Sequence, residues 1–327
     1  MEEIMGYRIG FDIGSTTIKA VVLDENNQIC YKSYERHKAQ VRQKALDKLV
    51  ELKKYTKEPF KFAISGSGAL GLCEQGELPF VQEVFASATG VSKLYPETDC
   101  AIELGGEDAK ILFFQGSVEQ RMNSTCAGGT GAFIDQMATL LNMSLEEMNE
   151  ASLNYHRLYP IASRCGVFAK TDIQPLINQG VDKCDLCASI FQAVVDQTIT
   201  SLAQGRKIEG NILFLGGPLY FMSGLRKRFV ETLKLSDVQV NCPETAINFV
   251  ALGTAICADQ EYTYDELYKA LEDLVHAPAK LTESKPLFES EEDYQKFIER
   301  HKSHDAKFTD LKNYAGKAYL GIDSGST

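Results

Sequence analysis

Two segments of the chain place an acidic residue directly before a glycine turn, and this pattern suits the binding of phosphate. The first segment is Asp12–Thr17, with the sequence Asp-Ile-Gly-Ser-Thr-Thr, and the second is Glu103–Asp108, with the sequence Glu-Leu-Gly-Gly-Glu-Asp. Glycine lets the backbone approach a ligand closely, so that successive N–H groups can surround a phosphate, and a carboxylate can hold Mg²⁺ through water. If the two turns face each other, they form a clamp on the phosphates of a nucleotide.

A third glycine turn, Leu215–Pro218, ends an apolar run and opens a helix pattern, which suits close passage of the backbone past a base or a ribose. Two other nucleotide folds are set aside, because the chain has no Walker-type phosphate loop and Gly129–Gly131 lacks the third glycine of a dinucleotide-binding fingerprint. Taken singly, each of the three turns is more often a plain hairpin or a helix-capping loop. Their order along the chain is what favours a nucleotide site.

Two of the nine cysteines lie where a thiolate would be stabilised. Cys126 precedes a glycine-rich turn and a predicted helix, and Cys165 precedes another predicted helix. The partial positive charge of a helix N-terminus lowers the pKa of a thiol and favours metal binding. A [4Fe–4S] cluster usually takes four cysteine ligands, so two identical chains could supply two each. The alternative is that both thiols are small buried apolar groups, as most cysteines are.

The remaining cysteines and histidines favour structural roles. Cys184 and Cys187 form a Cys-x-x-Cys pair, but no second pair lies at zinc-finger spacing, so we assign both to the opening of a helix. The five histidines form no metal-binding pair, and we expect them on the surface. The other cysteines lie in or beside apolar segments and are expected to be core residues: Cys30, Cys73, Cys100, Cys242 and Cys257.

The spacing of apolar residues predicts the elements that position these turns. The order of three strands, a helix, a strand and a helix occurs twice, which predicts an α/β protein with two similar lobes facing each other across a cleft. In the first half the strands are expected at 7–11, 17–23, 28–35 and 61–65, and the helices at 40–54 and 82–93. In the second half the strands are expected at 100–104, 109–114, 117–121, 211–215 and 238–241, and the helices at 132–141, 167–174, 186–204, 220–233 and 246–259.

The amino-acid composition changes after residue 258, where Lys and Glu become frequent. Gly321–Thr327 also repeats Gly10–Thr16 at five of seven positions, which predicts the start of a second copy of the module, with chance as the alternative. The expected domains are a first lobe at 1–98, a second lobe at 99–258 whose final helix, 246–258, packs on the first lobe, a charged helical linker at 259–317, and the beginning of a second repeat at 318–327.

Composition limits the classes of function. The 34 basic and 45 acidic residues give a net charge of −11, which argues against a protein that follows nucleic-acid phosphates. We find neither an apolar stretch of ~18 residues nor a basic, apolar leader, so we expect no membrane span and no export. An odd number of cysteines without an export signal indicates reduced thiols and a cytoplasmic location.

With these residues in place, the sequence resembles the acetate kinase, sugar kinase, Hsp70 and actin superfamily. It resembles more closely the ATP-dependent activators of 2-hydroxyacyl-CoA dehydratases, the BadF/BadG/BcrA/BcrD ATPase family. The resemblance covers roughly Tyr7–Cys257 and implies two actin-like, ribonuclease-H-like lobes around a nucleotide cleft. Four segments carry it: Asp12–Lys19, Glu103–Lys110, Asn123–Gly131 and Ser163–Ala169.

The resemblance implies an ATPase that couples nucleotide binding to electron transfer. ATP or ADP with Mg²⁺ would bind between the lobes, and a [4Fe–4S] cluster would be shared by a homodimer, or by pairing with a second internal module. The electron would come from reduced ferredoxin or flavodoxin and pass to a 2-hydroxyacyl-CoA dehydratase or a related double-cubane cluster protein. The implied catalytic residues are Asp12, Glu103 and Asp108, the nucleotide-binding residues are Gly14, Ser15, Thr16, Thr17, Lys19, Gly105, Gly106, Lys110, Gly216, Gly217 and Pro218, and the cluster ligands are Cys126 and Cys165.

One departure from the family pattern is Glu103, which stands where simpler activators have Asp. Its longer arm is expected to displace the metal-bound water and weaken hydrolysis, although Glu107 and Asp108 could compensate. Two alternative functions stay open: a sugar or small-molecule kinase of the same fold with structural cysteines, and a nucleotide-dependent scaffold module.

Overall fold

The structure is a computed structural model, and it describes residues 6–57, 59–123, 128–162, 166–278, 286–302, 304–306, 308–310 and 312–323. The chain divides into two compact units, Met1–Pro278 and Ala279–Thr327. The larger unit contains both sheets. The smaller unit contains helix α12 (Glu291–Lys302), which buries none of its residues.

A five-stranded sheet forms the first lobe, in the order β10-β4-β1-β2-β3. Strand β2 pairs antiparallel with β1 and with β3, and β4 is parallel to β1. Ile9, Phe11 and Ile13 alternate along β1 and are fully buried, so the sheet is held by an apolar core on this face. The strands are β1 (Arg8–Ile13), β2 (Thr17–Leu23), β3 (Ile29–Arg36), β4 (Phe60–Ser65) and β10 (Gln260–Tyr262).

The second lobe repeats this arrangement with the order β7-β6-β5-β8-β9. Again three antiparallel strands are followed by a strand parallel to the first, because β5 pairs antiparallel with β6 and parallel with β8. The predicted α/β architecture with two similar lobes is confirmed. The strands are β5 (Cys100–Leu104), β6 (Ala109–Phe113), β7 (Glu119–Asn123), β8 (Ile212–Leu215) and β9 (Val240–Asn241).

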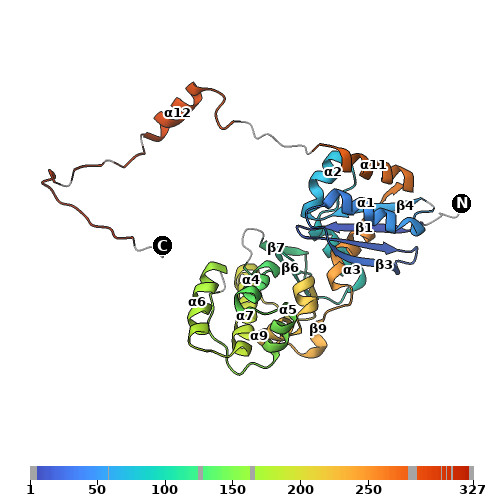
Figure 1. Cartoon of the computed structure of the whole chain (residues 1–327), viewed down its shortest axis with the longest axis horizontal. Helices are drawn as coiled ribbons and strands as arrows, with labels where there is room; N and C mark the ends of the chain where they lie inside the picture. The colour runs from blue at the N-terminus through green and yellow to red at the C-terminus, as the bar shows by residue number, and fades with distance from the viewer. Residues whose placement is uncertain are drawn as a thin grey trace. The chain divides into compact units, whose positions relative to one another are not determined.

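Helices on the outer face of the first sheet include one from far along the chain. Figure 1 shows α11 beside α1 and α2, and Leu267, Leu271 and Leu274 of α11 share the core of β1 and β4. The sequence reading began the charged linker at residue 259, and the structure differs there. Residues 260–276 complete the first lobe, because the i, i+4, i+7 leucines of α11 bury an apolar face. The helices are α1 (Val41–Glu51), α2 (Leu70–Gly76) and α11 (Tyr264–His276).

A second group of helices covers the second sheet. Lys183–Ala203, which is α7 with a π-helical extension, is long and apolar enough to span a membrane, but 72% of its apolar window is buried inside the protein. It is therefore the central core helix of this lobe. The helices are α4 (Gly131–Leu141), α5 (Leu145–Leu153), α6 (Gly166–Asn178), α7 (Lys183–Thr198), α8 (Gly217–Phe221) and α9 (Ser223–Leu233).

Two helices lie between the sheets. Helix α3 (Glu83–Leu94) packs along α10 (Phe249–Cys257), and α10 also contacts β1, β2 and β4 of the first sheet. Their apolar residues share one buried cluster with Leu23 of the first sheet and Leu213 of the second. This shared layer joins the two lobes and leaves the turns at the strand ends facing each other.

Candidate functional site

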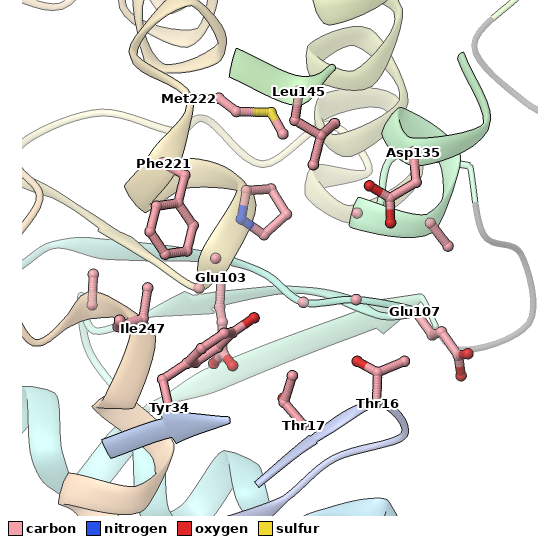
Figure 2. Close-up of a pocket in the computed structure, with 18 of the residues that line it drawn as sticks. Thr16, Thr17, Tyr34, Glu103, Glu107, Asp135, Leu145, Phe221, Met222 and Ile247 are labelled. Atoms are coloured by element: carbon pink, nitrogen blue, oxygen red, sulfur yellow. The ribbon is translucent and has the colours of Figure 1, made fainter. Parts of the chain in front are cut away.

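A cavity of about 540 Å³ lies between the lobes, and residues from all three predicted turns line it. Thr16 and Thr17 come from the first turn, Gly105 and Gly106 from the second, and residues 216–218 from the third. Figure 2 shows the two threonines and Glu103 on one side, with Phe221, Met222 and Leu145 across from them. The cavity therefore has a polar part and an apolar part, as a nucleotide does.

The two acid–glycine turns have the same backbone geometry. In the first, the Gly14 N–H donates to the Thr17 carbonyl at 2.9 Å, and in the second the Gly105 N–H donates to the Asp108 carbonyl at 2.8 Å. Each turn also places a lysine opposite its acid in the strand register. Asp12 pairs with Lys19, and Glu103 pairs with Lys110, seven residues further on in both cases.

The acid of the first turn forms a simple ion pair. Lys19 Nζ lies 2.7 Å from Asp12 Oδ2, and both residues are mostly buried. Burial alone would lower the pKa of Lys19, but the charge of Asp12 and its hydrogen bond raise that pKa above its ordinary value. Lys19 is thus held as an ammonium group at the cavity wall, where it can offset phosphate charge.

The second turn carries a larger charged cluster. Lys110 Nζ lies 2.8 Å from Asp108 Oδ2 and 3.5 Å from Glu103 Oε1, and it also binds Glu83 of α3. Burial alone would lower the pKa of Lys110, but the three carboxylates raise it well above the ordinary value. Burial raises the pKa of Glu103, whose other oxygen accepts a hydrogen bond from Ser87 at 3.1 Å. Three acids around one lysine leave a surplus of negative charge at this turn.

Several predicted residues do not reach the cavity directly. Asp12 and Asp108 hold the lysines beneath the turns rather than lining the space. Their influence on a bound phosphate therefore passes through the charge and position of their partners. The predicted residues that line the cavity are Thr16, Thr17, Lys19, Glu103, Gly105, Gly106, Gly216, Gly217 and Pro218, and those that do not are Asp12, Gly14, Ser15, Asp108 and Lys110.

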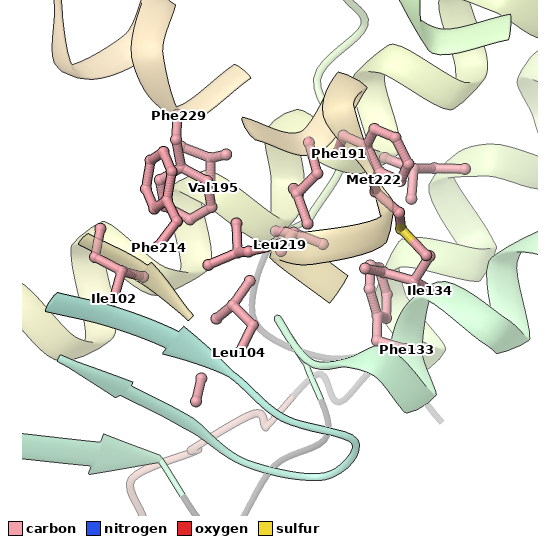
Figure 3. Packing of buried hydrophobic residues seen from close by; sticks show 14 of the residues in the cluster. Ile102, Leu104, Phe133, Ile134, Phe191, Val195, Phe214, Leu219, Met222 and Phe229 are labelled. Carbon is pink, nitrogen blue, oxygen red and sulfur yellow. The ribbon is translucent and has the colours of Figure 1, made fainter. Parts of the chain in front are cut away.

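The third turn depends on a glycine with a left-handed backbone. Gly216 has φ +86°, and a side chain there would place Cβ 2.0 Å from the Leu104 carbonyl. The turn leads into α8, which Leu219 anchors in the core of the second lobe (Figure 3). Met222, just after α8, belongs both to that core and to the cavity wall.

Sequence reasoning missed the apolar wall and an acidic edge. Tyr34 of β3 lies opposite Lys19 in the strand register, and its ring lies 6.3 Å from that of Phe221. Tyr34 lies within the strand predicted at 28–35 and Phe221 within the helix predicted at 220–233, so both elements were predicted but neither side chain was assigned to the site. The lining residues that the sequence analysis did not assign to the site are Tyr34, Arg36, Gly131, Ala132, Asp135, Leu145, Glu146, Asn149, Glu150, Phe221, Met222, Ala246, Ile247, Phe249 and Val250.

Helix α4 is attached to the second turn by its own N-terminus. The Gly131 N–H donates to the Gly105 carbonyl at 2.9 Å, and the Ala132 N–H donates to the Gly106 carbonyl at 2.8 Å. The first turn of a helix has N–H groups without partners inside the helix, and here the candidate phosphate turn satisfies two of them. A displacement of this turn would therefore pull on α4.

Cys126 and Cys165 lie outside the described residues. Helices α4 and α6 begin at residues 131 and 166, shortly after the two cysteines in sequence. Within the described part of the chain, no group of three or more metal-binding side chains occurs. Cys187 is fully buried with Sγ 3.8 Å from Met143 Sδ, and burial raises its pKa to about 12. The structure thus gives Cys187 the surroundings of a core residue.

Residues 9–258 match the model of the BadF/BadG/BcrA/BcrD ATPase family. The chain belongs to this family. A relative, the activator of lactoyl-CoA dehydratase from Anaerotignum propionicum, is 28% identical over 258 residues, which cover 77% of this chain and 97% of the relative. The (R)-2-hydroxyglutaryl-CoA dehydratase activating ATPase of Acidaminococcus fermentans is 27% identical over 256 residues, with 77% and 96% covered.

Solved structures of the family have the same fold. Component A of the Acidaminococcus fermentans (R)-2-hydroxyglutaryl-CoA dehydratase gives a TM-score of 0.68 at 25% identity, covering 82% of this chain and 99% of that one. The activator of the 2-hydroxyisocaproyl-CoA dehydratase from Clostridium difficile, solved with bound ADPNP, gives 0.67 at 26% identity, covering 83% and 98%. The expected two-lobed nucleotide-binding fold is confirmed.

Proposed function

We propose that this protein is an ATP-dependent activator that delivers an electron to a 2-hydroxyacyl-CoA dehydratase or a related double-cubane cluster protein. The observation that carries the proposal is the cavity where both acid–lysine turns meet, in a chain of this ATPase family. The relatives named as dehydratase activators match this chain over nearly their whole length. The kinase alternative has less support, because these relatives are named as dehydratase activators and not as kinases.

The cavity fits ATP with Mg²⁺ on chemical grounds. Lys19 and Arg36 supply positive charge, and the threonine turn supplies hydroxyl groups for phosphate oxygens. Glu103 and Glu107 line the cavity and could hold Mg²⁺ beside the phosphates, because carboxylates hold this cation directly or through water. Phe221 and Met222 offer an apolar wall for the adenine ring. Mg²⁺ would neutralise phosphate charge when bound.

Cys126 and Cys165 are the proposed ligands of a [4Fe–4S] cluster that two chains share. The thiols match the cluster in chemistry, because iron in such clusters is held by thiolates and each chain supplies two. The support from the described residues is that a helix begins shortly after each cysteine. A bound cluster would supply one-electron chemistry, taking the electron from reduced ferredoxin or flavodoxin. Such a thiol site requires a reducing compartment, and we place the activity in the cytoplasm.

Helix α4 would couple the nucleotide cavity to the proposed cluster ligands. ATP at the second turn changes the forces on the Gly105 and Gly106 carbonyls, and these carbonyls hold the N-terminus of α4. The helix follows the turn, and the segment that precedes the helix contains Cys126. ATP binding and hydrolysis would thereby change the surroundings of the proposed cluster ligands. The match of Gly321–Thr327 to Gly10–Thr16 fits a second such module further along the polypeptide.

Anaerobic purification with an iron count tests the proposal. A [4Fe–4S] protein shows broad absorbance near ~400 nm and about four irons per dimer. Cys126→Ala should lose the iron while ATP binding persists. The matched variant Cys30→Ala should keep both, because Cys30 of β3 is exposed rather than a core residue as predicted from the sequence. A protein that stays colourless after anaerobic reconstitution would contradict the electron-transfer function. ATP hydrolysis, measured on the same samples, tests the ATPase function separately.

A further inference from the structure

His37 is a buried histidine directly behind the first phosphate turn, and the proposed function so far leaves it without a role. It follows β3, and only 4% of its surface is exposed. The histidines are predicted to lie on the surface, and for His37 that prediction is wrong. The chain folds back over this residue in a tight turn, because Lys38 and Ala39 both have left-handed backbone angles, with φ +49° and +62°. Two such residues in succession without glycine mark a turn that the surrounding structure enforces.

The hydrogen bonds of the imidazole determine its protonation pattern. The Ala39 N–H donates to His37 Nδ1 at 3.2 Å, so Nδ1 acts as an acceptor and carries no proton. Nε2 therefore carries the proton of the neutral ring, and it lies 3.0 Å from the Gly14 carbonyl, to which it donates. The tight turn thus fixes one nitrogen of the ring, and the other nitrogen fixes the phosphate turn.

The backbone of His37 holds the same turn at a second point. Its N–H donates to the Thr16 carbonyl at 3.2 Å. The carbonyls of Gly14 and Thr16, on either side of Ser15, are therefore both bound to one residue. A peptide unit is planar, so a carbonyl that points toward His37 turns the N–H of the following residue the opposite way. This arrangement sets the direction of the Ser15 N–H before any ligand arrives.

We infer that His37 is a positioning residue for phosphate recognition, which presets the Gly14–Thr16 turn through its Nε2–H. The inference rests on the proposed function, since it concerns the same nucleotide site. His37 does not line the cavity, so its effect on a ligand passes through the turn. A turn that is ordered in advance binds phosphate without first losing conformational freedom. His37 should therefore matter for ligands with phosphates and leave the apolar wall unaffected.

Binding of MgATP and of adenosine to the full chain, measured by competition with a fluorescent nucleotide, tests the inference. His37→Ala should weaken ATP binding by at least about tenfold, which corresponds to the loss of one buried hydrogen bond, and leave adenosine binding within about twofold. His37→Gln, whose amide reaches the Nε2 position, should restore most of the ATP affinity. His37→Asn, whose amide reaches only the Nδ1 position, should not. The control His156→Ala changes an exposed histidine of the second lobe and should leave both affinities unchanged.

Each other outcome has a definite meaning. Unchanged ATP affinity in His37→Ala would overturn the inference, and so would an equal loss of ATP and adenosine binding, which indicates general damage to the fold. Failure of Gln to restore binding would also overturn it, because the Nε2 donor would then not be the operative group. If the unsubstituted chain binds MgATP no more tightly than adenosine, the proposed function itself fails, independently of His37.

Discussion

The two phosphate turns share a backbone but differ in the charges around them. In the first lobe, Asp12 meets Lys19 alone, and the pair is electrically balanced. In the second lobe, Lys110 meets three carboxylates, and negative charge is left over. The residues after the first glycine of each turn also differ in charge. Ser15 and Thr16 carry neutral hydroxyl groups, and the second turn has Gly106 and the acid Glu107 at these positions. The same backbone arrangement therefore carries a balanced ion pair in the first lobe and a surplus of negative charge in the second.

The same duplication extends to the glycine after each parallel strand. Gly66 follows β4 with φ +101°, and Gly216 follows β8 with φ +86°. In both, a Cβ would clash with a backbone carbonyl at the end of the neighbouring strand, Ile13 at 2.2 Å and Leu104 at 2.0 Å. The lobes thus share a structural requirement at these positions even though their charged groups have diverged.

The largest expected effect tests this shared requirement. Gly66→Ala and Gly216→Ala should each lower the free energy of unfolding by more than about 3 kcal/mol, because a strained φ adds to a backbone clash. Gly116→Ala is the matched control, with φ +86° in open space, and should cost only about 1 kcal/mol. Urea unfolding followed by circular dichroism measures all three. If Gly216→Ala cost no more than the control, the proposed equivalence of the lobes would be wrong.

The next prediction compares the two acids in catalysis. Asp12→Asn removes the single acid that balances Lys19 and should lower the rate of ATP hydrolysis by about a hundredfold. Glu103→Gln should lower it by about tenfold, because Asp108 and Glu83 still surround Lys110. Steady-state hydrolysis by the full chain gives both values. Equal losses, or a larger loss in Glu103→Gln, would remove the distinction between the turns.

The smallest expected effect is a dependence of stability on alkaline pH. The pKa of Lys110 is raised well above 10.5, so its contribution to stability is present below that pH and is lost as the pH rises further. Lys110→Met should remove this contribution, and the gap in unfolding free energy between the unsubstituted chain and the variant should narrow by up to about 1.4 kcal/mol per pH unit above 10.5. Unfolding of both proteins at pH 8 and pH 11 provides the measurement. A gap that widens instead would contradict the assigned ion pairs.

The three turns were accessible from the sequence because each is a local pattern of an acid, glycines and flanking apolar strands. The partnership of Lys110 with Glu83 was not, since Glu83 lies in a helix of the joining layer, 27 residues away. His37 was missed for a different reason, because its burial depends on a local turn that contains no glycine to mark it in the sequence.

Other omissions had a signal that went unused. The helix at Leu145 begins with a capping box in which Ser144 and Glu147 bond each other's backbone, and α11 begins with the same box at Thr263 and Glu266. The frequent charged residues after residue 258 favoured a linker where α11 forms. The buried leucines on one face of that helix show that its apolar spacing was the more informative pattern.

In the proposed nucleotide site, the two turns together hold the phosphates of ATP between the lobes. Calorimetric titration of the anaerobically prepared full chain with MgATP, ADP and adenosine tests it most directly. We expect one nucleotide per chain, an affinity that rises from adenosine to ADP to ATP, and a loss of the higher affinity for ATP when Mg²⁺ is chelated. Equal affinity for ATP and adenosine, with or without Mg²⁺, would contradict it.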